Sequence, residues 1–200
     1  MRGPRAGLVA AIAIFVLTTA QLAVAEFVDG IPQFEGKAFG ARLIAYPMLM
    51  AAVPLVWWWV GRRRSYDRAL PWTAFALIML PFFIDVTGNT LDLYDSISWW
   101  DDLNHFMNWL FLLWGCGLLI THSRVTPKWA LIITITGLGA ILAIGWELGE
   151  WYTFIRHGTE LNGAYEDTLG DEALGTLGAL MAAFIVARTV RPTPEEEAAP

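Results

Sequence analysis

Six long apolar stretches constrain this chain more than any other feature of its sequence. A transmembrane helix needs about 20 consecutive, mostly apolar residues. Stretches of this kind cover residues 7–25, 39–60, 70–88, 100–120, 129–152 and 172–190. Hydrophobic residues make up 56% of the chain and charged residues only 16%, too few to cover a water-facing surface. We therefore predict an all-α, polytopic membrane helix bundle with six transmembrane helices.

The connections between these stretches are short, so the predicted domain organisation is simple. Residues 1–191 form a single transmembrane bundle, and residues 192–200, rich in Pro and Glu, form a disordered C-terminal tail. The connections leave no room for a soluble catalytic domain. Any chemistry therefore has to come from the helices and their ends.

The positions of Lys and Arg predict the orientation of the bundle. Ten of the thirteen cations fall at one set of helix ends, namely Arg2, Arg5, Arg62, Arg63, Arg64, Arg68, Arg124, Lys128, Arg188 and Arg191. Only Lys37, Arg42 and Arg156 fall at the other. Because cytoplasmic ends carry the excess of cations, we predict that both termini are cytoplasmic. Fifteen of the nineteen acids then lie on the extracytoplasmic side.

The first stretch allows a second interpretation, and the net charge excludes one class of partner. A basic start followed by an apolar run that ends at Ala25 is also typical of a cleaved secretory signal. Cleavage would leave five helices in the same orientation. The net charge of −6 argues against nucleic acid as a partner, because a phosphate backbone needs a basic surface.

Several acids recur at helical spacing close to or inside the apolar stretches. Asp85, Asn89 and Asp92 follow one helix face in the third stretch. The other pairs are Asp101 with His105, Glu147 with Glu150, and Asp167 with Asp171. Ionisable groups at membrane depth are costly and usually face the interior of a bundle. The spacing therefore predicts a shared polar pocket at the extracytoplasmic side.

A pocket with this many carboxylates needs a neutralising partner. Like charges repel unless some are protonated or a cation binds them, and His105 alone cannot balance the acids. Carboxylates with one imidazole suit Zn, Mn, Fe or Mg. We expect a divalent metal held by Asp101, His105, Glu147, Glu150, Asp167 and Asp171. As catalytic residues we expect Asp101, His105, Glu147 and Glu150.

Plainer interpretations account for part of this pattern. Asp101 and Asp102 suit the N-terminal turn of a helix because of its dipole, and Asp167 with Thr168 could cap the last helix. Neither explanation covers Glu147 and Glu150, which end a stretch. A structural hydrogen-bond network that pins the bundle is a further alternative.

The motifs resemble a known group of proteins. Trp100-Asp101-x-Leu-x-His105-Phe106, Glu147-x-x-Glu150-Trp151 and Asp167-Thr168-x-x-Asp171 are similar to motifs of the YjdF-like bacterial membrane proteins, and more distantly to those of the VanZ-like family. The resemblance covers residues 85–185. It implies a small multi-pass protein of the bacterial cytoplasmic (inner) membrane, and it supplies no reaction. The sequence departs from the pattern at Asn104, where Gly is expected.

Three functions fit these observations. The leading hypothesis is a membrane-embedded enzyme that acts on a lipid or lipid-linked envelope substrate at the outer leaflet, with membrane lipids as its surroundings. The first alternative is a proton- or cation-coupled transporter, which would need polar groups that continue to the cytoplasmic side; few follow Asn108 in the fourth stretch. The second is a non-catalytic envelope protein. The sequence predicts no oligomeric state.

Overall fold

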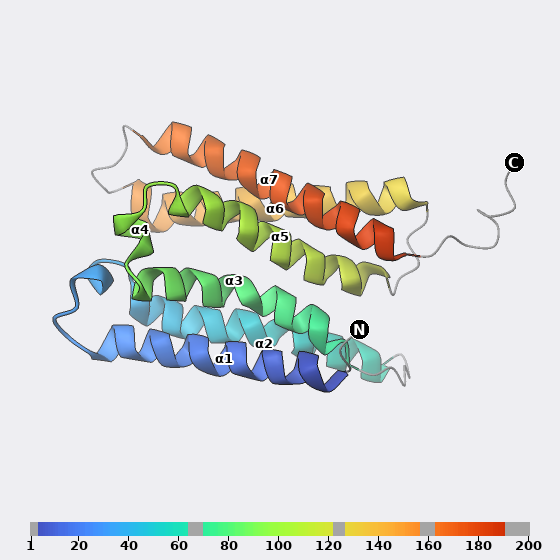
Figure 1. Cartoon of the computed structure of the whole chain (residues 1–200), viewed down its shortest axis with the longest axis horizontal. Helices are drawn as coiled ribbons and strands as arrows, with labels where there is room; N and C mark the ends of the chain where they lie inside the picture. Colours follow the sequence, from blue (N-terminus) through green and yellow to red (C-terminus); the bar gives the residue numbers. More distant parts are fainter. Residues whose placement is uncertain (1–3, 64–69, 122–126, 157–162, 191–200) are drawn as a thin grey trace, which may run out of the picture.

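A computed structural model describes residues 4–63, 70–121, 127–156 and 163–190 of the chain. Within these residues the structure is helical and contains no strand (Figure 1). The elements are α1 (Pro4–Phe27), η1 (Pro32–Phe34), α2 (Phe39–Arg63), α3 (Trp72–Thr90), α4 (Leu93–Ser96), α5 (Trp100–Ile120), α6 (Lys128–Glu150), the π-helix η3 (Trp151–Ile155) and α7 (Ala164–Thr189). The tail at 192–200 and the cations Arg2, Arg64, Arg68, Arg124 and Arg191 lie outside the described residues.

Six of the seven α-helices in the described residues, all except the short α4, are long and apolar enough to cross a membrane. This confirms the predicted polytopic helical bundle. The two ends of the described chain lie at the same end of the bundle, opposite α4 (Figure 1). The acids among the described residues, including the candidate site residues, lie toward the end that carries α4, which we call the α4 end.

The helix bounds differ from the predicted spans most clearly at α7. The apolar stretch begins at 172, but the helix begins at Ala164 and places Glu166 and Asp167 in its first turn. Acids are favourable at this position because the N-terminal end of a helix carries partial positive charge. Asp167 and Asp171 therefore both lie inside the helix.

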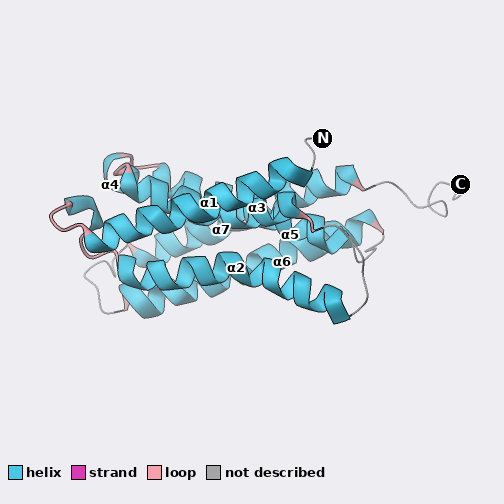
Figure 2. Ribbon diagram, turned by 90° about the horizontal axis from the view of Figure 1, so that it is seen from below, coloured by secondary structure: helices cyan, strands magenta, loops and turns pink. Residues whose placement is uncertain are grey.

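The long helices form an arc in which each packs mainly on its neighbours. The order is α2, α1, α3, α5, α7, α6. Leu22, Met50 and Phe75 belong to a core shared by α1, α2 and α3, and a second core lies among α5, α6 and α7. Figure 1 shows these two groups one above the other, and Figure 2 shows α2 and α6 on the same side of the bundle.

Small residues bring the central helices together. A Cβ at Gly115 of α5 would lie 2.7 Å from the carbonyl oxygen of Ala74 in α3. A Cβ at Gly178 of α7 would collide with the carbonyl oxygen of Phe106 in α5. Small residues at helix interfaces allow such close backbone contact. The α5–α7 contact holds the parts of the two helices that carry His105 and Asp171 side by side, where the candidate site lies.

Candidate functional site

One group of ionisable side chains lies where α5, α6 and α7 meet. His105 is at its centre. Its Nδ1 lies 3.1 Å from Oδ1 of Asp171 and 3.9 Å from Oε1 of Glu147, and its Nε2 lies 3.8 Å from Oδ1 of Asp101. We call these four residues the acid–His cluster. Three helices thus bring acids to one imidazole, as the sequence predicted for these four positions.

The acid–His cluster is largely removed from solvent. The side chains of Asp171 and Glu147 are 4% and 7% exposed, whereas that of Asp101 is 47% exposed. Nδ1 of His105 is buried and makes no aligned hydrogen bond in the described part of the chain, although Asp171 is within 3.1 Å. Buried charges are costly unless they are paired. Three carboxylates around one imidazole therefore leave negative charge that a cation would neutralise.

Three members of the cluster have the spacing of metal ligands. One donor atom from each of Asp101, His105 and Asp171 lies within 4.8 Å of the other two. Two carboxylates and one imidazole are a donor set for Zn, Mn or Fe. Three protein ligands also leave coordination positions for water or substrate. Glu147 is a further carboxylate beside this group.

Two of the predicted site residues lie apart from the cluster. Glu150 accepts a hydrogen bond of 2.9 Å from Nε1 of Trp146, one turn earlier on α6. Glu147 and Glu150 lie on the same side of α6, but Glu147 lies 3.9 Å from His105, whereas Glu150 is bonded to Trp146 and lines the cavity. Asp167 lies one turn before Asp171 and is exposed.

The helix ends exclude one of the two capping interpretations and agree with the other. The N-caps of α5 and α7 are Trp99 and Gly163, and neither makes a side-chain capping bond. Asp167 with Thr168 therefore does not cap α7, because that helix begins before them. Asp101 and Asp102 do lie in the first turn of α5, where the helix dipole favours acids.

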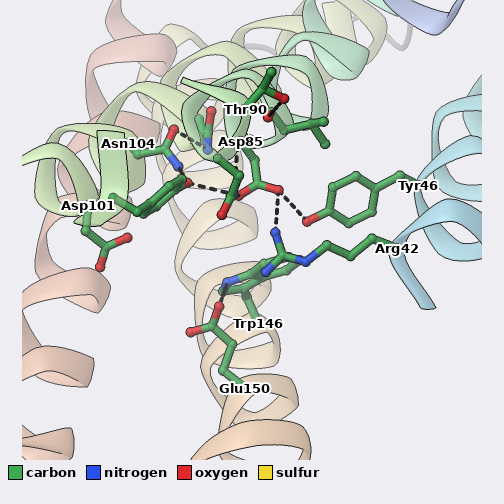
Figure 3. Close-up of polar contacts among 12 residues, drawn as sticks. Arg42, Tyr46, Asp85, Thr90, Asp101, Asn104, Trp146 and Glu150 are labelled. Carbon is green, nitrogen blue, oxygen red and sulfur yellow. Dashed lines mark hydrogen bonds and ion pairs between the residues drawn. The ribbon is translucent and has the colours of Figure 1, made fainter. Parts of the chain in front are cut away.

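A second polar group surrounds Asp85 on α3, and Figure 3 shows its contacts. Oδ2 of Asp85 accepts hydrogen bonds from Nη1 of Arg42 at 3.0 Å and from the Tyr46 hydroxyl at 2.7 Å. Oδ1 accepts from the Tyr94 hydroxyl at 2.9 Å and from Nδ2 of Asn89 at 3.4 Å. We call these five residues the Asp85 node. Four donors satisfy this one carboxylate.

A chain of amides extends the Asp85 node along α5. Nδ2 of Asn108 donates to Oδ1 of Asn104 at 2.9 Å, and Nδ2 of Asn104 donates to the Tyr94 hydroxyl. Burial raises the pKa of the Tyr94 phenol, and the Asp85 carboxylate raises it further. The Tyr94 phenol therefore stays protonated and donates a hydrogen bond to Asp85. These contacts explain why this chain has Asn104 at the position where the resembled pattern has Gly.

A cavity of about 340 Å³ connects the two groups. Asp101 and His105 line it from the acid–His cluster, and Arg42, Tyr46, Asp85, Asn89 and Tyr94 line it from the Asp85 node. Trp146 and Glu150 complete the α6 wall. The cavity contains part of the predicted pocket: Asp85, Asn89, Asp101, His105 and Glu150 line it, whereas Asp92, Glu147, Asp167 and Asp171 do not. Its lining also includes the cations Lys37 and Arg42.

The basic side of this cavity was not predicted from the sequence. Arg42 was counted only as a cation at a helix end, and Tyr46 was not among the candidate site residues. The available signal was their spacing of one turn on an otherwise apolar helix. The prediction that Asp92 continues the helix face of Asp85 and Asn89 was wrong. Helix α3 ends at Thr90, and Asp92 adopts a left-handed backbone conformation with φ 59°.

Comparison with known proteins gives a match to one family. No curated protein and no solved structure matches the chain. Residues 10–192, which include both polar groups and the cavity, match the family described as Predicted membrane protein (DUF2238). The VanZ-like resemblance stays a prediction. The chain therefore belongs to the predicted membrane protein family DUF2238.

Proposed function

We propose that this protein is a metal-dependent enzyme of the bacterial cytoplasmic membrane that acts on a lipid or lipid-linked substrate at the α4 end. The observation that carries the proposal is the convergence of Asp101, His105 and Asp171 within 4.8 Å beside a cavity. Family membership supports placing the chain with the YjdF-like proteins, because their motifs lie within the matched residues. The excess of cations at the opposite end supports placing the α4 end outside the cytoplasm.

The cluster residues have distinct roles in this proposal. Asp101, His105 and Asp171 hold a divalent cation, which supplies Lewis-acid polarisation of a substrate oxygen when bound. Glu147, 3.9 Å from His105, takes or returns a proton as general base and acid. The exposed side of Asp101 faces the cavity, where a substrate reaches the site.

The residues beneath the cavity favour an enzyme over a transporter. Leu113, Ile135 and Val186 are fully buried in the core shared by α5, α6 and α7. A proton or ion relay needs polar groups that continue across the bilayer. The apolar core supports a pocket open to one end. Coupled flux through proteoliposomes that Glu147→Gln abolishes would favour the transporter instead.

Metal analysis tests the proposal directly. We expect one equivalent of Zn, Mn, Fe or Mg in detergent-purified protein by inductively coupled plasma mass spectrometry. His105→Ala and Asp171→Asn should both lose it. The matched control is Glu166→Gln, which changes an exposed acid on the same helix as Asp171 and should retain the metal. Wild-type protein that stays free of stoichiometric metal after incubation with each ion would overturn the proposal.

A further inference from the structure

The two walls of the cavity come from helices at opposite ends of the arc. Arg42 and Tyr46 belong to α2, and Trp146 and Glu150 belong to α6. Yet α2 packs mainly on α1, and α6 packs mainly on α7. Figure 2 shows α2 and α6 on the same side of the bundle. In the described part of the chain, these two helices thus face one another across the cavity without packing closely together.

The helix faces that border this gap are apolar below the cavity. Leu49 lies about one turn beyond Tyr46 on α2 and is 49% exposed. Leu142 lies one turn before Trp146 on α6 and is 39% exposed. Residues three or four apart share a helix face. Both leucines therefore continue the cavity-lining faces toward the middle of the membrane, where a lateral opening would meet acyl chains.

The lining of the cavity changes from polar to apolar with depth. Along α5 it runs from Asp101 through Asn108 to Leu112, a distance of about 16 Å at 1.5 Å per residue. This length is close to the thickness of one leaflet of a bilayer core, about 15 Å. Lys37 and Asp95 line the cavity near α4, and Pro81, Phe82 and Trp109 line its deeper part. A lipid has the same order of polar and apolar groups.

Arg42 is placed to bind an anion inside this cavity. Its guanidinium makes one hydrogen bond within the described residues, to Asp85 through Nη1, while a guanidinium has five N–H donors. Asp85 needs no more of them, because Tyr46, Tyr94 and Asn89 also donate to it. Arginine can hold a carboxylate on one edge and a phosphate on another.

We propose that the cavity binds the headgroup of a membrane phospholipid, with its phosphate on Arg42 and its acyl chains leaving between α2 and α6. Asp101 and Glu150 also line the cavity and complement a headgroup that carries an amine next to the phosphate. Phosphatidylethanolamine has this chemistry. The inference rests on the proposed function only where it makes this lipid the substrate; binding itself needs no metal.

Calorimetric titration tests the inference, with dihexanoyl phosphatidylethanolamine as the probe and EDTA in the buffer. We expect saturable binding to protein in maltoside micelles, and binding at least tenfold weaker for dihexanoylglycerol and for inorganic phosphate. Arg42→Gln should weaken binding of the lipid at least tenfold. Arg42→Lys keeps the charge that faces Asp85 but loses the forked donors, and should weaken it several-fold. Arg156→Gln, which changes a cation stacked on Tyr152, is the matched control and should bind normally.

A second pair of variants tests the route between the helices. Leu49→Trp fills the face of α2 that continues from Arg42. It should weaken lipid binding without changing the guanidinium. Ile44→Trp changes the opposite, 67% exposed face of the same helix and should leave binding unchanged. Equal effects of the two variants would overturn the lateral route. Inorganic phosphate that binds as tightly as the lipid would overturn the lipid as occupant.

The outcomes separate this inference from the proposed function. Lipid binding in EDTA that depends on Arg42, together with a metal-free protein, supports the inference and removes the metal enzyme. Stoichiometric metal with no lipid binding retains the metal site and overturns the inference. Unchanged binding by Arg42→Gln in a folded protein also overturns it.

Discussion

The acid–His cluster and the Asp85 node are built from similar residue types at the same end of the bundle, but their hydrogen bonding differs. Asp85 accepts bonds from Arg42, Tyr46, Tyr94 and Asn89. In the cluster, Asp101, Glu147 and Asp171 surround His105, whose Nδ1 makes no aligned hydrogen bond within the described residues. Glu147 also has a side-chain hydrogen bond with Thr168. The Asp85 carboxylate has four donors, whereas the three carboxylates of the cluster share one imidazole and one hydroxyl.

This difference distinguishes a structural carboxylate from a group suited to a ligand. A buried carboxylate that accepts several hydrogen bonds and faces a cation is stable as it stands, and it ties its helices together. Buried carboxylates that face one another repel, and the repulsion falls when a cation binds between them. The Asp85 node should therefore contribute to stability, and the acid–His cluster should reduce it until a metal is bound.

The largest expected effect comes from breaking the Asp85 node. Asp85→Ala leaves the Arg42 charge and two tyrosine hydroxyls without their acceptor and should reduce the free energy of unfolding by about 3–5 kcal/mol. The measurement is thermal unfolding in detergent, followed by the reaction of the single, half-buried Cys116 with a thiol dye. Asp95→Ala, which changes an exposed acid, is the control. Equal losses in the two variants would contradict a special role for Asp85.

An intermediate effect should come from separating the helices of the cluster without touching its side chains. Gly178→Ala places a Cβ against the backbone of Phe106 and should cost about 1–3 kcal/mol. It should also weaken metal binding, because α5 carries His105 and α7 carries Asp171.

The matched control is on the same helix. A Cβ at Gly170 meets nothing within 4 Å, so Gly170→Ala should raise stability by about 0.5–1 kcal/mol and leave metal content unchanged. A comparable loss of stability from both alanines would show that close α5–α7 contact at Gly178 is not the cause.

The smallest effect should have the opposite sign. Asp171→Asn removes one of three neighbouring carboxylates and should raise the stability of the metal-free protein on the order of 1 kcal/mol, since it relieves repulsion. Added metal should stabilise the wild type and not the variant. The same unfolding measurement, made with EDTA and with metal, checks both points, and Asp102→Asn on an exposed face serves as control. If the metal-free variant were less stable than the metal-free wild type, the acid–His cluster would be a structural network like the Asp85 node.

Helix number and the gathering of acids at one end could be predicted because both follow local patterns. Long apolar stretches fold as helices in a membrane whatever lies beside them, since every backbone group must be satisfied within the segment. Spacings of three and four likewise put Asp101 and His105 on one face. The same rule could not show that Glu147 and Glu150 have separate surroundings, because that depends on which helices lie on either side of α6.

The sequence by itself determined the membrane-spanning class, the six helices and the polarised charge of this protein, because these depend on composition and on contacts within one turn. Only the tertiary structure decided which acids meet. The close contact of α5 with α7 joins His105 to Asp171, and the arc of helices brings Arg42 of α2 across from Trp146 of α6. Such pairings depend on the depth at which one helix packs on another, and small residues far from the site set that depth.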